Sequence, residues 1–335
     1  MSLSSSQVIL TISQYYTIYS SFILLFSGIF GHTAIIFVLA HLKSFRGNPS
    51  AFYLITESIV DLLEIIILLT SRIAMYGFGN DLTQISLFWC RLRALFVQSF
   101  TLISFSIVCF AAIDQYLSTS YYPFLRQKST IKLAKLLTII AIIICILHGI
   151  PVLFLFEIHS TYGCYAYNII FFNYITYFYY LILTGALPII ISTIFSVLAY
   201  QNVRHIVRRH MSMSRRKLDQ QLTAMILIRV GFLVIMTLPY VLQRIYTLST
   251  SINNSNIMSQ AIVQLIATIT SSFYFLNYTG SFYLFLISSK RFRRQVKHVF
   301  IHKYWRTYCS KRIRQNQVGV LSQCSISEND LQSVH

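Results

Sequence analysis

Long apolar runs constrain the fold of this chain more than any other feature. Each run reaches the length of about 20 mostly apolar residues that a helix needs to cross a hydrocarbon core of about 30 Å. The runs are too long for membrane-barrel strands and lack the alternation of apolar and polar residues that such strands show. We therefore predict an all-α membrane protein, a seven-transmembrane helix bundle. The predicted spans cover roughly residues 17–40, 51–76, 88–115, 134–156, 174–200, 221–248 and 259–287.

The composition agrees with a membrane protein. The 335 residues are 56% hydrophobic and only 11% charged, and the mean hydropathy is +0.63. Soluble domains average about 25% charged residues and less than half apolar ones. The net charge of +18 would by itself fit a nucleic-acid-binding protein. Most of the cations lie in the segments between the spans, on one predicted side of the membrane, so we expect no nucleic acid partner.

The basic residues predict the orientation of the bundle. If the N-terminus lies outside, the inner segments 41–50, 116–135, 201–219 and 288–335 hold 22 of the 27 Lys and Arg residues. The outer segments hold only Arg91 and Arg93. Cytoplasmic loops carry an excess of Lys and Arg, so we expect an extracellular N-terminus and a cytoplasmic C-terminus. The cationic inner face suits anionic membrane lipid or an acidic protein surface.

An amphipathic segment follows the last span. Phe292, Val296, Val299, Phe300 and Tyr304 recur at steps of three and four residues among cations. This pattern predicts a helix that lies on the membrane surface. The chain then divides into an extracellular tail (1–16), the bundle (17–287), the amphipathic eighth helix (288–308) and a disordered cytoplasmic tail (309–335).

Two residues are candidates for covalent modification. Cys309 directly follows the amphipathic helix, where palmitoylation is common, and an unmodified thiol is the alternative. Asn253 begins an Asn-Asn-Ser sequon in the third outer loop, so we predict that it is glycosylated.

Several landmarks follow one another in a fixed order. Cys90 opens the third span, and Asp114-Gln115-Tyr116 ends it. Pro188 and Pro239 lie inside the fifth and sixth spans. Together with the seven spans and the eighth helix, this order resembles the rhodopsin-like G-protein-coupled receptors over about residues 17–300. The resemblance implies a plasma-membrane receptor that is not an enzyme, and we find no metal-ligand spacing or activated nucleophile.

The resemblance also implies a disulfide and a polar core. Cys164 lies in the second outer loop, at the position that pairs with Cys90 in the family. Asp61 matches an acid that holds a sodium ion in many relatives, and Ser104, Asn277 and Ser281 fall at or near the other positions of that site. A carboxylate at membrane depth costs about 3 kcal/mol on the insertion scale. A sodium ion, a proton or hydrogen bonds must offset that cost.

The switch residues depart from the family pattern. In the family, an Arg at the position of Gln115 pairs with its neighbouring Asp and with an acid at the base of the sixth span. Activation frees that Arg, and the sixth span swings outward to admit the G protein. Here Asp219 supplies the acid, but Gln115 is neutral and lacks the bidentate charge pairing of Arg. We therefore expect a weaker resting contact among Asp114, Gln115, Tyr116 and Asp219.

A cation inside the sixth span points to a relocated contact. Arg229 lies about ten residues into that span, and cations at such depth are rarely left unpaired. Glu57, Asp61 and Glu64 are spaced at i, i+4 and i+7, so they share one face of the second span. We hypothesise that Arg229 pairs with Glu57 or Asp114. The alternative is that Arg229 reaches the inner surface by snorkelling.

The outer half of the bundle limits the ligand class. Val97 replaces the Asp of amine receptors, and residues 259–287 contain no Lys to bind retinal. Arg244 suits a carboxylate, a polar amide or an acidic peptide side chain, unless it snorkels to water. The Tyr-rich second outer loop suits peptide contact or a membrane interface. The residues that we predict to bind ligand are Arg93, Val97, Gln98, Tyr240, Gln243, Arg244 and Gln264.

Three classes of function stay open. The first is a receptor that binds an extracellular ligand, a peptide by our prediction, and activates a heterotrimeric G protein. The segments "DQYLS" and "SSKRFRR" are similar to invertebrate neuropeptide receptors, including FMRFamide-type ones. The second is a signalling-impaired binding or decoy protein, which the neutral Gln115 favours. The third is an ion-coupled transporter that uses Glu57, Asp61 and Glu64, although we see none of the repeats typical of transporters.

Overall fold

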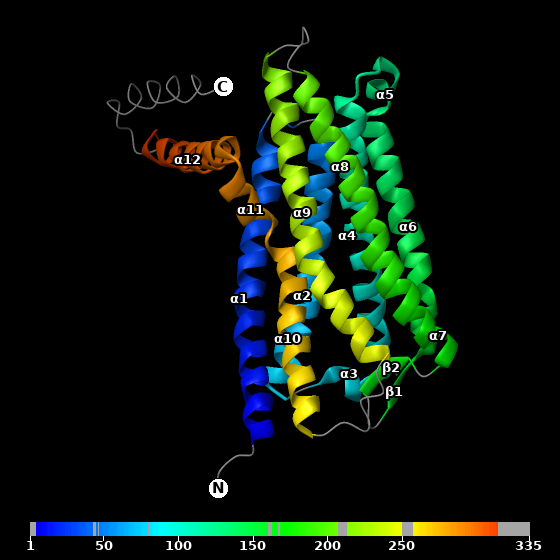
Figure 1. Cartoon of the computed structure of the whole chain (residues 1–335). Coiled ribbons are helices and arrows are strands. Elements are labelled where there is room, and N and C mark those ends of the chain that lie inside the picture. Colours follow the sequence, from blue (N-terminus) through cyan, green and yellow to red (C-terminus); the bar gives the residue numbers. More distant parts are fainter. Residues whose placement is uncertain are drawn as a thin grey trace.

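A computed structural model describes residues 5–42, 45, 47–79, 81–159, 163–166, 168–206, 213–249 and 257–313. Long helices lie side by side and form one elongated bundle (Figure 1). The long helical segments are α1 (Ser5–His41), α2 (Pro49–Gly77), α4 (Leu87–Thr119), α6 (Ile131–Leu155), η2 (Tyr174–Ala186) continued by α8 (Leu187–Ile206), α9 (Met213–Ser249), and α10 (Ile257–Thr279) followed by α11 (Ser281–Ser288).

The prediction of a seven-helix membrane bundle is confirmed. Six of the described helical segments are long and apolar enough to cross a membrane. The seventh long helix, α2, does not belong to that group because it carries Glu57, Asp61, Glu64 and Arg72. It packs between α1 and α4 within the bundle. Helix α1 begins at Ser5, twelve residues before the predicted start of the first span at residue 17.

The two ends of the bundle carry different short elements. One end holds α3 (Leu82–Ile85), the hairpin β1 (Phe156–His159) and β2 (Gly163–Ala166), and α7 (Ile169–Asn173). We call it the disulfide end. The opposite end holds α5 (Pro123–Lys128) and α12 (Lys290–Ile313), and we call it the α12 end (Figure 1). Three polar sites lie inside the bundle at different heights between these two ends.

Polar caps fix where several helices begin. The side chain of Asn48 accepts hydrogen bonds from the backbone N–H groups of Ser50 and Ala51, and a proline occupies the first position of α2. Ser86 and Thr130 cap α4 and α6 in the same way. Such caps satisfy N–H donors that have no partner within the helix. The caps therefore set the ends of these helices independently of their apolar interiors.

The disulfide end is closed by a hairpin that a covalent bond holds in place. Strands β1 and β2 are antiparallel, with Ile158 opposite Cys164. A disulfide joins Cys164 to Cys90 near the start of α4, as the family resemblance implied. The Nε–H of Arg91 also donates a hydrogen bond of 2.8 Å to the carbonyl oxygen of Phe156. The hairpin is thus fixed over the end of the bundle.

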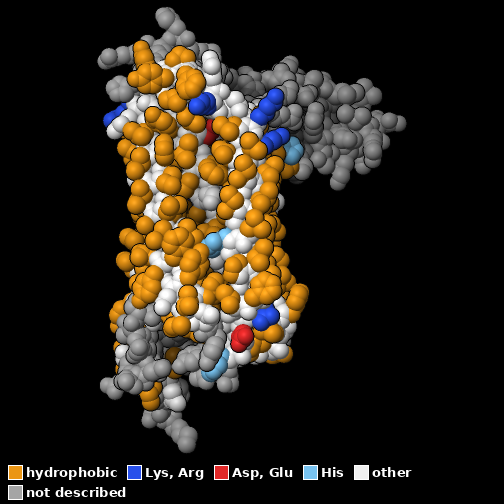
Figure 2. All heavy atoms as spheres, turned by 90° about the vertical axis from the view of Figure 1, so that its right-hand side faces the viewer, with side chains coloured by type: hydrophobic (Ala, Val, Ile, Leu, Met, Phe, Trp, Pro, Cys, Tyr) orange, Lys and Arg blue, Asp and Glu red, His pale blue; other side chains and the backbone are white. Residues whose placement is uncertain are grey.

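The surface of the bundle matches its environment. On the face shown in Figure 2, hydrophobic side chains cover the waist of the molecule, and most of the visible Lys and Arg side chains lie near the α12 end. Helix α6, for example, exposes Ile139, Ile143 and Leu147 along one side. Such a continuous apolar surface is suited to lipid contact and not to water.

The amphipathic eighth helix is also confirmed, as α12. This helix turns away from the axis of the bundle (Figure 1). Phe292 is fully buried, and its ring lies 5.9 Å from that of Phe285 and 6.2 Å from that of Phe282 on α11. Cys309 belongs to α12, but its side chain lies outside the described part of the chain, as does residue Asn253 of the predicted sequon.

We predict that a methyl group at Gly149 weakens the bundle. A Cβ there would lie 2.6 Å from Leu95 Cδ1 and 2.7 Å from Ser99 Oγ, whereas a Cβ at Gly231 would meet no atom within 4 Å. Gly149→Ala should therefore cost about 1–3 kcal/mol through overpacking. Gly231→Ala should be neutral or stabilising, because Ala favours helix over Gly. Thermal unfolding of the purified protein in detergent measures both, and equal stability of the two variants would contradict the packing.

Candidate functional site

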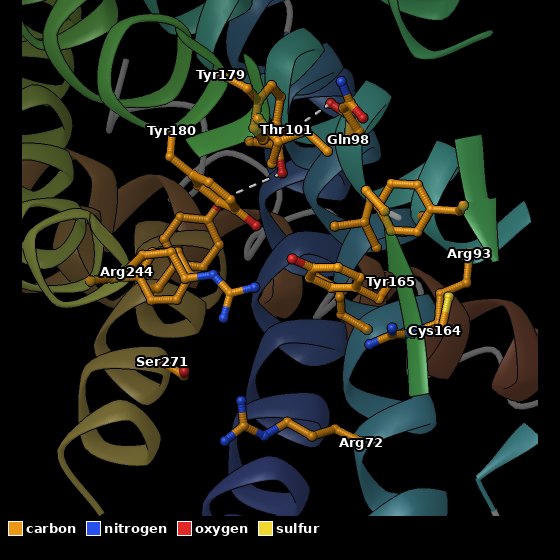
Figure 3. Close-up of a pocket in the computed structure, with 18 of the residues that line it drawn as sticks. Arg72, Arg93, Gln98, Thr101, Cys164, Tyr165, Tyr179, Tyr180, Arg244 and Ser271 are labelled. Carbon is orange, nitrogen blue, oxygen red and sulfur yellow. Dashed lines mark hydrogen bonds between the residues drawn. The ribbon is translucent and has the colours of Figure 1, made fainter. Parts of the chain in front are cut away.

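A cavity of about 380 Å³ opens near the disulfide end (Figure 3). Side chains from five long helical segments and from the hairpin form its wall, so residues far apart in the sequence meet there. Its size lies at the lower end of the range for small-molecule sites. The lining residues are Leu68, Arg72, Arg93, Ala94, Val97, Gln98, Thr101, Phe156, Cys164, Tyr165, Ala166, Phe172, Ile175, Tyr179, Tyr180, Tyr240, Arg244, Ser271, Tyr274 and Phe275.

Three arginines dominate the chemistry of this cavity. Arg72 comes from α2, Arg93 from α4 and Arg244 from α9, and Figure 3 shows them reaching toward the same space. The guanidinium carbon of Arg72 lies 5.0 Å from the centre of the Phe275 ring, and that of Arg244 lies 5.4 Å from the Tyr180 ring centre. These cation–π contacts hold the guanidinium groups in place.

Tyrosines form much of the remaining wall. The rings of Tyr240 and Tyr274 stack at 4.3 Å, and the ring of Tyr180 meets that of Tyr240 edge-on at 6.4 Å. Tyr179 and Tyr180 are adjacent in η2, where the helix widens to a π-type turn just before Pro188. Segments of π-helix occur frequently at functional sites. The wall therefore combines flat aromatic surface with hydroxyl groups.

Most of the residues predicted to bind ligand lie at this cavity, but two do not. Arg93, Val97, Gln98, Tyr240 and Arg244 line it. Gln243 and Gln264 are absent from its wall. The amide of Gln243 instead donates to Thr247 on the same helix, and Gln264 points to the exposed side of α10.

Arg72 is the main residue that the sequence analysis missed. It lies within the predicted second span, where a cation needs a partner as much as Arg229 does in the sixth span. The same signal would have found it. The tyrosines of η2 carried no comparable signal, because aromatic residues are common throughout this chain.

Arg229 forms an ion-paired cluster deeper in the bundle. Its Nε lies 2.6 Å from Glu57 Oε1, and its Nη1 donates to Asn277 Oδ1 at 2.6 Å. Its Nη2 lies 3.8 Å from Asp61 Oδ2. Arg229 is 1% exposed, so it does not snorkel to the surface. Of the two acids predicted as partners, the structure pairs Arg229 with Glu57.

The guanidinium of Arg229 lies beside Asp61 and Asn277, two of the residues that the family resemblance assigns to a sodium site. Ser104 donates to Asp61 Oδ1 at 2.6 Å, and Asn277 bonds to Arg229. Ser281 is buried, and its hydroxyl has no hydrogen-bond partner in the described part of the chain. The donor set suits a cation, and the chain supplies one of its own. A sodium ion would compete with Arg229 for Asp61 and Asn277.

Hydrogen bonds also run from the cavity wall into the interior of the bundle. Thr101 lines the cavity and donates to Glu64 Oε1 at 2.6 Å. Its hydroxyl also lies 3.3 Å from that of Tyr274, which accepts a bond of 2.7 Å from Tyr278. The backbone oxygen of Tyr278 lies 2.5 Å from His32 Nε2. A change at the cavity wall therefore reaches buried polar groups directly.

A third polar site joins the helices near the α12 end. The amide of Gln115 donates to Ser50 Oγ at 2.6 Å and accepts from Thr223 Oγ1 at 2.7 Å. Asp114 accepts from Ser50 at 2.6 Å and from Ser129 at 2.7 Å. Gln115 thus connects α2, α4 and α9 through neutral hydrogen bonds.

Two other predicted switch residues take different places around this site. Asp219 lies on α9, one turn before Thr223, which is the α9 residue that bonds to the Gln115 amide. The ring of Tyr116 packs 5.6 Å from that of Phe195 on α8. The contact between α4 and α9 therefore exists, although Gln115 makes it through a threonine hydroxyl.

Comparison with known families identifies one match. The family model described as "7 transmembrane receptor (rhodopsin family)" matches residues 31–279. This range is more than half of the chain, and it contains the cavity, the Arg229 cluster and the Gln115 site. A search of curated proteins finds no match.

We predict that Ser50→Ala destabilises the α12 end more than Ser58→Ala does. Ser50 donates to Asp114 and accepts from Gln115, so its loss leaves two buried polar groups short of a partner. Such a loss costs about 1–3 kcal/mol. Ser58 is equally buried on the same helix, but it bonds only to the carbonyl oxygen of Leu54. Thermal unfolding in detergent compares the two, and a larger loss for Ser58→Ala would contradict this account.

Proposed function

The chain belongs to the rhodopsin family of seven-transmembrane receptors, and from this premise we propose that it is a plasma-membrane receptor for an extracellular peptide. In this proposal the ligand enters the cavity at the disulfide end, and a heterotrimeric G protein binds at the α12 end. The family supports a cell-surface G-protein-coupled receptor directly. The ligand class and the coupling are the proposed part.

Two independent arguments support the proposed orientation. Most basic residues fall in the segments near the α12 end, and cytoplasmic loops are enriched in Lys and Arg. The Cys90–Cys164 disulfide lies at the other end, and disulfides persist on the oxidising, extracellular side of a cell. Both arguments support an extracellular cavity and a cytoplasmic α12.

The observation that carries the proposal is the Arg229 cluster. It ties α9, the sixth span, to α2 through Glu57 and to α10 through Asn277. Removing one partner of a buried ion pair costs about 3–5 kcal/mol, because a buried charge is then left alone. An outward movement of α9 would stretch these contacts. The cluster therefore supports a resting state in which α9 is held against α2.

The Gln115 site is a second and weaker contact between α9 and its neighbours. Gln115 and Thr223 are both neutral, and a typical neutral hydrogen bond contributes only about 1 kcal/mol. We infer that the resting state depends mainly on Arg229. An agonist must then bind the active state more tightly than the resting state by enough to offset the ion pair.

A narrower ligand prediction does not fit the cavity well. A peptide that ends in Phe-Met-Arg-Phe-amide carries a cation and has no C-terminal carboxylate. The three cavity arginines would repel that cation. The resemblance to FMRFamide-type receptors therefore stays a prediction, and the charge of the cavity argues for a different peptide end.

A decoy receptor is the second candidate, and the neutral Gln115 favours it. The transporter interpretation loses its main support, because Arg229 holds Glu57 and lies near Asp61, while Glu64 accepts a bond from Thr101. These acids are already engaged inside the bundle. They do not form an open path for ions.

We predict that Arg229→Leu raises ligand-free nucleotide exchange on a purified G protein by about tenfold or more, since 1.4 kcal/mol corresponds to a tenfold change. The double variant Arg229→Leu with Glu57→Leu should show the same rise, and it leaves no unpaired Glu57 in the bundle. Arg91→Leu, at the other end of the bundle, should leave exchange unchanged. If both Arg229 variants reach the membrane and exchange is unaltered, the proposed contact is wrong.

A second prediction separates the receptor from the decoy. Gln115→Arg places a cation beside Asp114, which strengthens the resting contact, so ligand-free exchange should fall or stay level. The same exchange assay measures it. A rise of about tenfold would show instead that the natural Gln115 impairs coupling, and the decoy interpretation would then stand.

A further inference from the structure

The cavity at the disulfide end carries a positive charge that no acid in its described wall balances. Arg72, Arg93 and Arg244 line it, and the described residues of the wall include no Asp or Glu. Two described acids lie at this end of the protein. The carboxylate of Asp81 accepts hydrogen bonds from the backbone and hydroxyl of Thr83, and Glu157 is exposed on β1. Neither lines the cavity, although Asp81 lies close enough to Arg93 to interact with it electrostatically.

The contrast with Arg229 shows that this imbalance is particular to the cavity. Arg229 has Glu57 at 2.6 Å and Asp61 at 3.8 Å. Within the described residues, these are the ion pairs that the arginines of the membrane helices form. The Nε atoms of Arg72, Arg93 and Arg244 are each buried without a hydrogen-bond partner. Cations at membrane depth normally pair with a counter-charge, so a counter-charge from outside the chain is expected.

The three guanidinium groups are held ready to bind. Arg72 stacks over Phe275 and Arg244 over Tyr180. Arg93 lies one turn after Cys90, which the disulfide fixes to the hairpin. A stacked guanidinium uses its face, so its N–H edge can still pair with a carboxylate, although the edge of Arg244 also interacts with the side chain of Tyr180. Charge attraction is also stronger in a cavity than in bulk water.

We propose that this cavity recognises a ligand end with two or more carboxylate groups. The clearest source is the C-terminus of a peptide with an acidic residue beside its terminal carboxylate, and a free dicarboxylate presents the same chemistry. A volume of about 380 Å³ holds such an end and not a whole peptide. The inference depends on the proposed function only for the entry of the ligand at the disulfide end.

Binding to the purified full-length protein tests the proposal without a known ligand. The probes are glutarate and glutaramide, which share a carbon skeleton but differ in charge, at constant ionic strength. A ligand that binds the folded state raises the unfolding midpoint, and at a given concentration the rise is larger for a ligand with a lower Kd. Glutarate should bind at least about tenfold more tightly than glutaramide. Equal binding of the two would overturn the proposal.

Variants assign the binding to the three arginines. Arg72→Gln, Arg93→Gln and Arg244→Gln should each weaken glutarate binding by about tenfold, as expected for a charge-assisted contact. Arg126→Gln is the control for overall charge, because Arg126 lies on α5 at the α12 end, away from the cavity wall, and the variant should bind glutarate normally. If Arg126→Gln loses as much affinity as the others, the effect is one of general charge and the site is wrong. The wild-type comparison decides the matter for any variant that fails to fold.

Peptides distinguish the two sources of carboxylate. The tetrapeptide Gly-Phe-Asp-Phe with a free C-terminus presents two carboxylates, and its C-terminal amide presents one. Tighter binding of the free acid than of the amide and of glutarate supports a peptide ligand. Binding no tighter than that of glutarate supports a small dicarboxylate. Phe-Met-Arg-Phe-amide should not bind, and a preference for it over the diacid peptide would overturn the proposal.

The outcome also separates this proposal from the proposed function. If glutarate binds selectively but no variant stimulates nucleotide exchange, the anion site stands and the coupling is wrong. If Arg229→Leu stimulates exchange but glutarate and glutaramide bind alike, the receptor stands and the anion site is wrong.

Discussion

The need to balance charge inside an apolar bundle governs this structure. Arg229 is buried with Glu57 at 2.6 Å and Asp61 at 3.8 Å, and each of these groups alone would be costly at membrane depth. Because the partners come from α2 and α9, the charges also determine which helices must stay together. At the cavity, by contrast, the positive charge of three arginines has no acid among the described wall residues to balance it.

The polar sites form a sequence along the bundle axis. The arginine cavity lies at the disulfide end, the Arg229 cluster in the interior, and the neutral Gln115 site near the α12 end. Thr101 connects the first to the interior, because it lines the cavity and bonds to Glu64. Helix α9 contributes to all three sites through Arg244, Arg229 and Thr223. A movement of α9 would therefore alter all three together.

The sequence predicted the parts of this arrangement that depend on local patterns. Apolar runs and amphipathic spacing predicted the bundle and α12, and the depth of Arg229 in a span predicted a buried acidic partner. Which side chains pair with each other depends on how the helices pack, and a single sequence does not show that packing. The choice of Glu57 over Asp114, the bond of Gln115 to Thr223, and the meeting of Arg72 with Arg244 all belong to this kind. Gln243 shows the same limit, because spacing alone did not reveal that its amide turns back to Thr247.

The charged residues of α2 have a consequence for biosynthesis. Membrane helices enter the bilayer from the translocon largely on their own hydrophobicity, and α2 falls short because of its acids. Its partner Arg229 lies 172 residues after Glu57, so it is still untranslated when α2 emerges. The nascent α2 must therefore wait beside α1 and α4, or hold its acids protonated, until α9 arrives. Insertion of this protein is thus a cooperative event that finishes only with the sixth span.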